Sequence, residues 1–348
     1  MAKPGRGAPP FLPYACPVTP ADLSWTVLHA VRRAVDEDVL RAPVPARVRV
    51  ERTRPGGRGD YATAVALQLA GPAALPARKV AEILRERVQG TPGIGGVEVT
   101  GPGFLNFTLD GDDGLAALVG AIEAGGTEYG HGDALVGVTA SFVPVEELRA
   151  RVVTGTVERL LRSQGAEVGA RTADGEALHV VPVPAADRDL FARLGSDAAR
   201  WALLRAAPHD RARCTGSDEL LVQQESNPLF RVRYAYARTR ALSRNAQQLG
   251  FCGAYEERVD APVLGALLAD HPGVLAAAAR HREPDRLARQ LEAVAHAFFD
   301  FHDGAAPLPV GDEKPSAAHR SRLALAEAAG TVLAGGLSLL GISAPEVL

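Results

Sequence analysis

Apolar residues recur at helical spacing early in the chain, at Leu23, Val27, Val31 and Val35. Thr19 is suited to cap the start of such a helix, and Pro20 fits its first turn. The pattern therefore predicts a helix from Thr19 to about Asp36. Residues 1–18 are rich in proline and poor in apolar residues, which predicts a disordered leader.

Helical and strand-like spacing alternate over the next part of the chain, up to Leu109. We expect a strand at Val48 and Val50, helices at 60–70 and 77–88, and strands at 97–99 and 104–109. Mixed helices and strands of this kind predict an α+β N-terminal domain over residues 19–110.

One long helical stretch flanked by short apolar runs follows. We expect helices at 115–122 and 145–164 and strands at 136–142, 166–169 and 178–183. A β-α-β segment of this size is a fragment of a doubly wound sheet. Residues 111–190 are therefore predicted to form a remnant Rossmann-like α/β segment.

Beyond residue 186 the spacing is helical throughout. Long periodic stretches run over 197–207, 218–249, 285–300 and 315–340. They are separated by residues that interrupt helices, among them Gly250, Pro272 and the loop 304–309. Residues 191–348 are therefore predicted to form an all-α helix-bundle C-terminal domain.

Bulk composition narrows the class of protein. The chain has 348 residues, 47% of them hydrophobic, and a formal net charge of −3, which favours a globular protein over one that coats nucleic acid through bulk positive charge. Its three cysteines, Cys16, Cys214 and Cys252, are widely spaced and predict neither a disulfide framework nor a zinc site. We see no apolar run of about 18 residues and no secretion signal. We therefore expect a cytoplasmic protein that does not span a membrane.

One stretch of the C-terminal half is strongly basic. Between Asn227 and Gly253 there are five arginines and no acidic residue. At about 100° per residue, three of them share one stripe of a helix: Arg233, Arg240 and Arg244. The other two, Arg231 and Arg238, lie on a second stripe beside Tyr234.

Two interpretations of this helix stay open. In the first, its guanidinium groups grip phosphates while Tyr234 stacks on an unpaired base, as in proteins that hold single-stranded RNA loops. In the second, the arginines pair with acidic residues elsewhere in the chain and the tyrosines pack inside the bundle.

The same helix carries a family motif. The run from Asn227 to Arg238 resembles the pattern N-P-x-F-Y-V-Q-Y-A-H-A-R of arginyl-tRNA synthetases, and Asp197-Ala198-Ala199-Arg200 resembles the D-A-L-R signature of their anticodon-binding domain. Leu339–Glu346 is similar to that family's C-terminus. The resemblance implies that residues 191–348 bind an anticodon stem-loop. The residues it assigns to this contact are Arg231, Arg233, Tyr234, Arg238, Arg240 and Arg244.

Two motifs near the start of the chain resemble the N-terminal domain of the same synthetases, which reads the tRNA D-loop. They are Gly59-Asp60-Tyr61-Ala62-Thr63 and Pro102–Phe107. The resemblance implies D-loop binding by Asp60, Tyr61, Phe104 and Asn106. Alternation along a strand would set Phe104 and Asn106 side by side and turn Leu105 and Phe107 to the core. In the alternative, Asn106 is a strand-edge residue that satisfies backbone groups.

The catalytic signatures of that family are missing. Ala140–Pro144 and Arg159–Val168 resemble the segments that flank its H-I-G-H signature, but Glu147–Thr154 between them contains neither the two histidines nor the glycine. The chain also has no K-M-S-K-S-like loop. Because those histidines contact ATP phosphates, the resemblance implies a catalytic domain that no longer forms an adenylate.

We therefore predict an arginyl-tRNA synthetase-like tRNA-binding protein, a truncated relative without aminoacylation activity of its own. We expect no catalytic residue, no metal and no cofactor. The expected partner is tRNA, with tRNA-Arg as the candidate, and an intact synthetase is a candidate protein partner. Two alternatives stay open: arginine–tRNA ligase activity through a divergent site or in trans, which would require ATP, and a protein-interaction module that no longer binds RNA.

Overall fold

The computed structural model describes residues 20–348 except 54–57, 92, 110–113, 185–188 and 213–216. The predicted leader, residues 1–18, and the predicted cap Thr19 lie outside the described residues. The contacts of the chain divide it into two compact units: residues 24–117 belong to the first, and residues 118–348, together with residues 20–23, belong to the second. Each unit is described by itself below.

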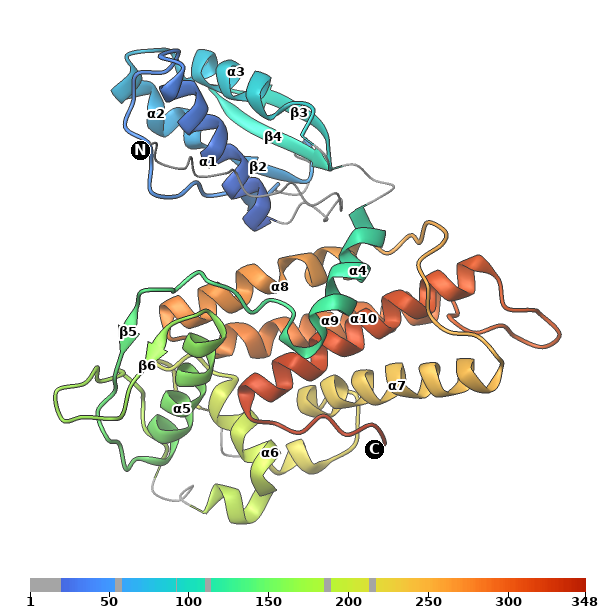
Figure 1. Ribbon diagram of the computed structural model, residues 1–348. Coiled ribbons are helices and arrows are strands. Elements are labelled where there is room, and N and C mark those ends of the chain that lie inside the picture. The colour runs from blue at the N-terminus through green and yellow to red at the C-terminus, as the bar shows by residue number, and fades with distance from the viewer. Residues whose placement is uncertain (1–19, 54–57, 92, 110–113, 185–188, 213–216) are drawn as a thin grey trace, which may run out of the picture. The chain divides into compact units, whose positions relative to one another are not determined.

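The first unit is an antiparallel sheet with helices on one face (Figure 1). Its elements are α1 (Pro20–Asp36), β1 (Glu51–Arg52), β2 (Tyr61–Thr63), α2 (Val65–Ala73), α3 (Ala77–Val88), β3 (Ile94–Thr100) and β4 (Phe104–Leu109). The strand order is β1-β2-β4-β3, and α2 and α3 pack against the sheet. Helix α3 and strand β4 have the bounds expected from the sequence.

Alternation along β4 determines which side chains enter the core of this unit. Leu105 and Phe107 are fully buried, as expected, and Tyr61 and Thr63 on the neighbouring strand pair with them across the ladder. The prediction of a helix at 60–70 is therefore wrong in its first residues. Burial in the sheet overrides the local helical spacing, and α2 begins only after Thr63, whose hydroxyl accepts the N–H of Val65 at 3.3 Å.

The second unit contains most of the helices. Its elements are α4 (Gly114–Gly125), β5 (Thr139–Ala140), α5 (Leu148–Ser163), β6 (Glu167–Val168), α6 (Leu190–Leu204), α7 (Pro228–Gln248), α8 (Pro262–His281), α9 (Asp285–Gly304) and α10 (Ala317–Leu340), with short 3-10 segments at Gly126–Glu128 and Ser217–Leu221. Helices α7 to α10 form a bundle, in which α10 packs against the other three (Figure 1).

The start of the second unit holds one β-α-β unit. Strands β5 and β6 pair in parallel on either side of α5, each over two residues. The expected strand at 178–183 does not form. Instead the N–H of Val181 donates to Pro208 O at 2.8 Å, and the N–H of Val183 donates to the Glu147 carboxylate at 3.0 Å. A Rossmann-like origin for this segment stays a prediction.

Helices α7 and α10 pack closely at Gly330 of α10. A side-chain carbon at Gly330 would lie 2.2 Å from the Thr239 hydroxyl oxygen on α7, so no larger residue fits at that position unless Thr239 moves. The sequence predicted one helix over 218–249, but α7 begins only at Pro228. Asn227 caps it, since its side-chain oxygen accepts the N–H of Phe230 at 3.1 Å.

Helix α8 was not expected, because Pro272 was interpreted as a helix break. Proline at 272 leaves the carbonyl of Leu268 without its helical donor, and the Tyr129 hydroxyl donates to that oxygen at 3.4 Å. Next to Pro272, His271 is buried against Tyr129 and hydrogen-bonded to Gln290 at 2.8 Å. Burial lowers the pKa of His271 to about 4, against the opposing effect of the Gln290 hydrogen bond.

No apolar run long enough to span a membrane was expected from the sequence, but two helices of the described chain, α8 and α10, each contain an 18-residue window that is long and apolar enough by length and composition alone. In α10, 78% of that window is buried among the other helices of the unit. Its apolar composition is therefore explained by its place in the core of the bundle.

Candidate nucleic-acid interface

The basic helix is α7, and its two arginine stripes have different surroundings. We call Arg233, Arg240 and Arg244 the paired stripe, because each contacts an acidic residue of the same chain. Arg233 Nη2 lies 3.7 Å from Asp197 Oδ2. Glu346 forms ion pairs with the other two arginines: Arg240 Nε lies 3.2 Å and Arg244 Nη1 lies 3.6 Å from its carboxylate oxygens. For this stripe the structure shows the second interpretation, arginines paired within the chain.

The other stripe carries an aromatic row. We call Arg231, Tyr234 and Arg238 the aromatic stripe. Tyr234 is 42% exposed, and its ring stacks with the rings of Phe230 and Phe299, with centroids 5.4 Å away in both cases. Tyr234 therefore holds a fixed orientation while part of its surface stays open to solvent.

The two arginines of the aromatic stripe face histidines of α9. Arg231 Nη1 lies 3.1 Å from His296 Nδ1, and Arg238 Nη2 lies 3.3 Å from His302 Nε2. Among the described residues, no carboxylate lies within ion-pair distance of either guanidinium. Their positive charge is therefore not neutralised by the described part of the chain, in contrast to that of the paired stripe.

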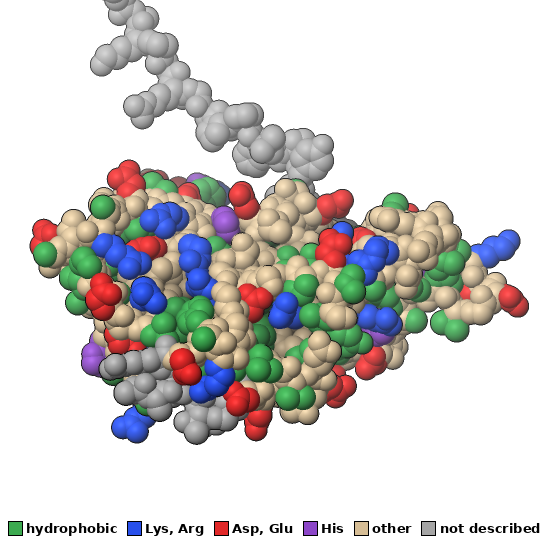
Figure 2. Space-filling view, turned by 90° about the horizontal axis from the view of Figure 1, so that it is seen from below, with side chains coloured by type: hydrophobic (Ala, Val, Ile, Leu, Met, Phe, Trp, Pro, Cys, Tyr) green, Lys and Arg blue, Asp and Glu red, His purple; other side chains and the backbone are tan. Residues whose placement is uncertain are grey.

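Acidic and basic side chains alternate over the face of the molecule seen in Figure 2, without one broad basic patch. This distribution agrees with the net charge of −3. Any contact with a polyanion is therefore local, and it depends on which arginines lack an acidic neighbour.

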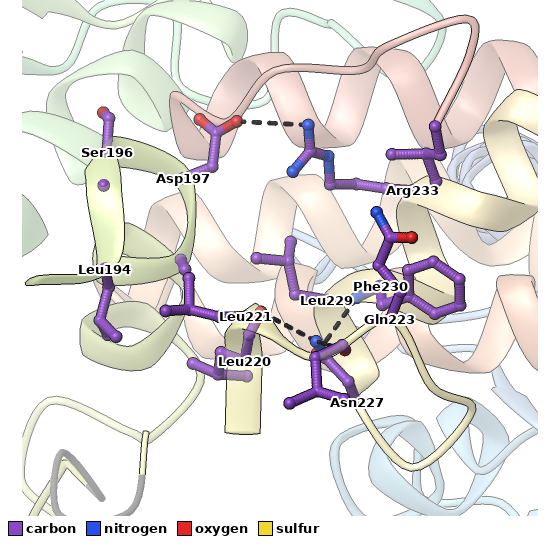
Figure 3. A pocket seen from close by; sticks show the side chains of 14 residues that line it. Leu194, Ser196, Asp197, Leu220, Leu221, Gln223, Asn227, Leu229, Phe230 and Arg233 are labelled. Carbon is purple, nitrogen blue, oxygen red and sulfur yellow. Dashed lines mark hydrogen bonds and ion pairs between the residues drawn. The ribbon is translucent and has the colours of Figure 1, made fainter. Parts of the chain in front are cut away.

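A cavity of about 330 Å³ lies between α6, the 3-10 segment Ser217–Leu221 and the start of α7. Figure 3 shows the Asp197–Arg233 ion pair on one side of it and Asn227 on the other. The Asn227 amide donates to Leu220 O and Val222 O, each at 2.9 Å, so its polar atoms are used inside the protein. The rest of the lining is mostly apolar. No local pattern indicated this cavity, because it depends on the non-helical path of residues 222–227.

The four residues expected to bind a D-loop do not form one exposed group. Phe104 is 38% exposed, but Asn106 is only 6% exposed, and its amide donates to the Thr100 hydroxyl at 2.6 Å. Tyr61 is 4% exposed and belongs to the core. In the free protein both side chains are therefore covered, and D-loop binding by Asn106 and Tyr61 stays a prediction. Asp60 is exposed, and its backbone N–H donates to Phe107 O at 2.7 Å.

The start of α5 is closed by its own chain. Glu147 caps this helix: one carboxylate oxygen accepts the N–H of Ala150 at 2.7 Å, and the other accepts the N–H of Val183 at 3.0 Å. A helix N-terminus attracts anions because its first N–H groups lack partners. Here an internal carboxylate already occupies that position.

Arg149, two residues further along, is fully buried and donates to backbone carbonyls. Its guanidinium contacts six of them: Val181, Leu203, Ala206, Ala207, Pro208 and Asp210. Leu203 belongs to the last turn of α6, where carbonyls lack helical partners. Arg149 thus ties α5 to the end of α6 and to the segment after it. Sequence reasoning missed this role, since nothing in the pattern marks an arginine as buried.

Within the described ranges, no group of three or more His, Cys, Asp or Glu side chains is arranged to hold a metal ion. His296 and His302 face arginines instead.

Comparison with known proteins adds the family. Residues 26–109 match the model of the arginyl tRNA synthetase N terminal domain, and residues 232–348 match that of the DALR anticodon binding domain. An arginine–tRNA ligase of Renibacterium salmoninarum is 27% identical over 549 aligned residues, which cover 94% of this chain and 100% of that protein. Since this chain has 348 residues, the ligase contains a long stretch without counterpart here.

A second relative and a solved structure agree with this. An arginine–tRNA ligase of Pseudarthrobacter chlorophenolicus is 40% identical over 173 residues, covering 46% of this chain and 30% of that protein. The arginyl-tRNA synthetase of Thermus thermophilus shares the fold with a TM-score of 0.63 at 14% identity, over 94% of this chain and 99% of that one. The chain belongs to the arginyl-tRNA synthetase family.

Proposed function

We propose that this protein binds tRNA with the tRNA-recognising parts of an arginyl-tRNA synthetase and does not aminoacylate it alone. In this proposal residues 19–110 are the D-loop domain, 111–190 the remnant of the catalytic Rossmann domain, and 191–348 the anticodon-binding bundle. The two matched family models lie on either side of residues 110–231, which supports this division.

The observation that carries the loss of catalysis is the closed start of α5. The resemblance places the H-I-G-H signature at Glu147–Thr154, where histidines and helix N–H groups would meet ATP phosphates. In this chain the Glu147 carboxylate takes an N–H of that helix end and brings a negative charge to it. Arg149 cannot compensate, because its donors are directed at backbone carbonyls. A phosphate would therefore meet repulsion where the family needs attraction.

The surface proposed to hold the anticodon loop is the aromatic stripe. Tyr234 offers a partly exposed ring for stacking with an unpaired base, and Arg231 and Arg238 offer guanidinium groups without a carboxylate among the described residues. The paired stripe contributes less in the free protein, since a phosphate there must displace Glu346 or Asp197. In the first unit, Phe104 is the exposed ring proposed to contact the D-loop.

Fluorescence anisotropy with labelled tRNA across a salt series tests the proposal. We expect binding in the submicromolar to micromolar range at low salt and a steep loss with added salt, because arginine–phosphate contacts release counterions. Comparing tRNA-Arg with other tRNAs shows whether binding is selective. Absence of binding at the lowest salt would refute the proposed function.

Arginine- and tRNA-dependent exchange of pyrophosphate into ATP tests the loss of catalysis separately. We expect no exchange above background with the purified protein. Exchange that requires this chain would instead support a divergent active site. The same assay with an intact synthetase added shows whether the chain acts in trans.

A further inference from the structure

Two arginines outside the α7 stripes approach each other where α5, α6 and α10 meet (Figure 1). Arg159 lies on α5, Arg200 lies on α6, and both reach Gly341, which caps the C-terminal end of α10. A side-chain carbon at position 341 would lie 3.0 Å from Arg159 Nη2 and 3.2 Å from Arg200 Nη1. These two nitrogens are therefore at most about 6 Å apart.

Each of the two guanidinium groups has N–H donors that its hydrogen bonds within the described chain do not use. Arg159 Nε donates to Leu339 O at 2.8 Å, and its Nη2 donates to the Thr156 hydroxyl at 2.9 Å. Arg200 has a long contact from Nε to the Ser196 hydroxyl, 3.4 Å, and lies over the ring of Phe191. Across the described part of the chain, no carboxylate forms an ion pair with either arginine.

The nearest acidic residues are already engaged. Glu158 pairs with Arg171 at 2.8 Å, and Asp197 pairs with Arg233 and accepts two hydrogen bonds from Ser343. Burial lowers the pKa of Arg159 and repulsion from Arg200 lowers it further, while the charge of nearby Glu158 acts in the opposite direction. Among the described residues, two like charges are thus held close together without an ion-pair partner of their own, an arrangement that an anion between them would stabilise.

We propose that Arg159 and Arg200 form a phosphate site, which takes one phosphodiester group of the RNA backbone. The site rests on the proposed function for its ligand and is separate from the α7 surface. Two guanidinium forks at this separation can share the oxygens of one phosphate, as arginine pairs commonly do. Gly341 keeps the space between them open, and exposed Ser196 at the rim leaves the site accessible.

Chemical modification tests the site without RNA. Phenylglyoxal modifies accessible arginines, and mass spectrometry reports the extent at each position. We expect inorganic phosphate to slow modification of Arg200 several-fold and to leave Arg151 unaffected. Arg151 is the matched control, because it is an exposed arginine on α5 with no ion pair to a described residue. Equal modification of Arg200 with and without phosphate would overturn the site.

The variant Arg200→Gln tests the same site with tRNA. We expect about fivefold weaker binding at low salt and a salt slope reduced by about one, because one phosphate contact is lost whatever the sequence of the RNA. Arg151→Gln removes the same charge and should change neither quantity. Equal affinity and slope for both variants would refute the RNA contact. Phosphate protection without any tRNA binding would instead refute the proposed function and leave the phosphate site supported.

Discussion

Replacing Arg149 by Met tests how much its guanidinium stabilises the second unit. Of the six carbonyls it contacts, two have another donor: Pro208 O accepts the N–H of Val181, and Ala207 O accepts the N–H of Asp210. For the other four carbonyls, and apart from hydrogen bonds within regular helices, Arg149 is the donor among the described residues. At about 1 kcal/mol net for each such bond, and with a side chain of similar length filling the space, we expect a loss of about 4 kcal/mol.

Tryptophan fluorescence provides the assay. The chain has two tryptophans, Trp25, which is exposed on α1, and Trp201, which is fully buried on α6. In a Trp25→Phe background, urea unfolding therefore reports on the helix that Arg149 caps. A loss of about 4 kcal/mol at a slope of about 2 to 3 kcal/mol per molar urea lowers the midpoint by roughly 1.3 to 2 M.

Arg151→Met is the control, because it removes an exposed arginine two residues away on the same helix. Its free energy of unfolding should stay within about 0.5 kcal/mol of that of the parent protein. If Arg149→Met and Arg151→Met unfold at the same urea concentration, the carbonyl contacts do not stabilise the fold and the reasoning is wrong.

Three further changes have expected outcomes. Between pH 6.5 and 4, His271 is protonated in the unfolded chain but stays neutral in the folded protein, where its pKa is about 4. The free energy of unfolding therefore falls by up to about 3 kcal/mol as the pH is lowered through this range. His271→Gln should lose that part of the pH dependence in urea titrations, and an unchanged profile would exclude His271 as its source. Glu346→Gln frees Arg240 and Arg244 and should tighten tRNA binding several-fold by anisotropy, whereas the exposed control Asp312→Asn should not; equal effects would contradict a shielding role. Tyr234→Leu should weaken tRNA binding at least about fivefold and Tyr234→Phe should preserve it, since the ring supplies the stacking; equal losses would point to the hydroxyl.

Local patterns predicted the elements whose own residues determine them. Helix α3 and strand β4 have the expected bounds, because their apolar spacing matches the face that they bury. Residues 61–63 were wrongly predicted to be helical, because pairing with β4 stabilises a strand there more than the local apolar spacing favours a helix. Helix α8 was missed because the compensation for Pro272 comes from Tyr129, which is distant in sequence.

The candidate site shows the same limit. Helical spacing correctly separated the arginines of α7 into two stripes, but it could not show that Glu346 and Asp197 cover only one of them. Alternation placed Phe104 and Asn106 on one face of β4, yet the Thr100 hydroxyl binds the Asn106 amide. Which segments pack over a surface depends on the whole chain, and no local pattern contains that information.

The close approach of α7 to α10 has a consequence for recognition. Thr239 sits against Gly330 and follows directly after Arg238, so α7 cannot rotate about its axis or move outward without losing this contact. The direction in which Tyr234 and its flanking arginines point is therefore set before any ligand arrives. A partner that fits this surface would therefore lose little affinity to the entropy cost of ordering these side chains. A partner of another shape would bind weakly, because the surface cannot rearrange to fit it.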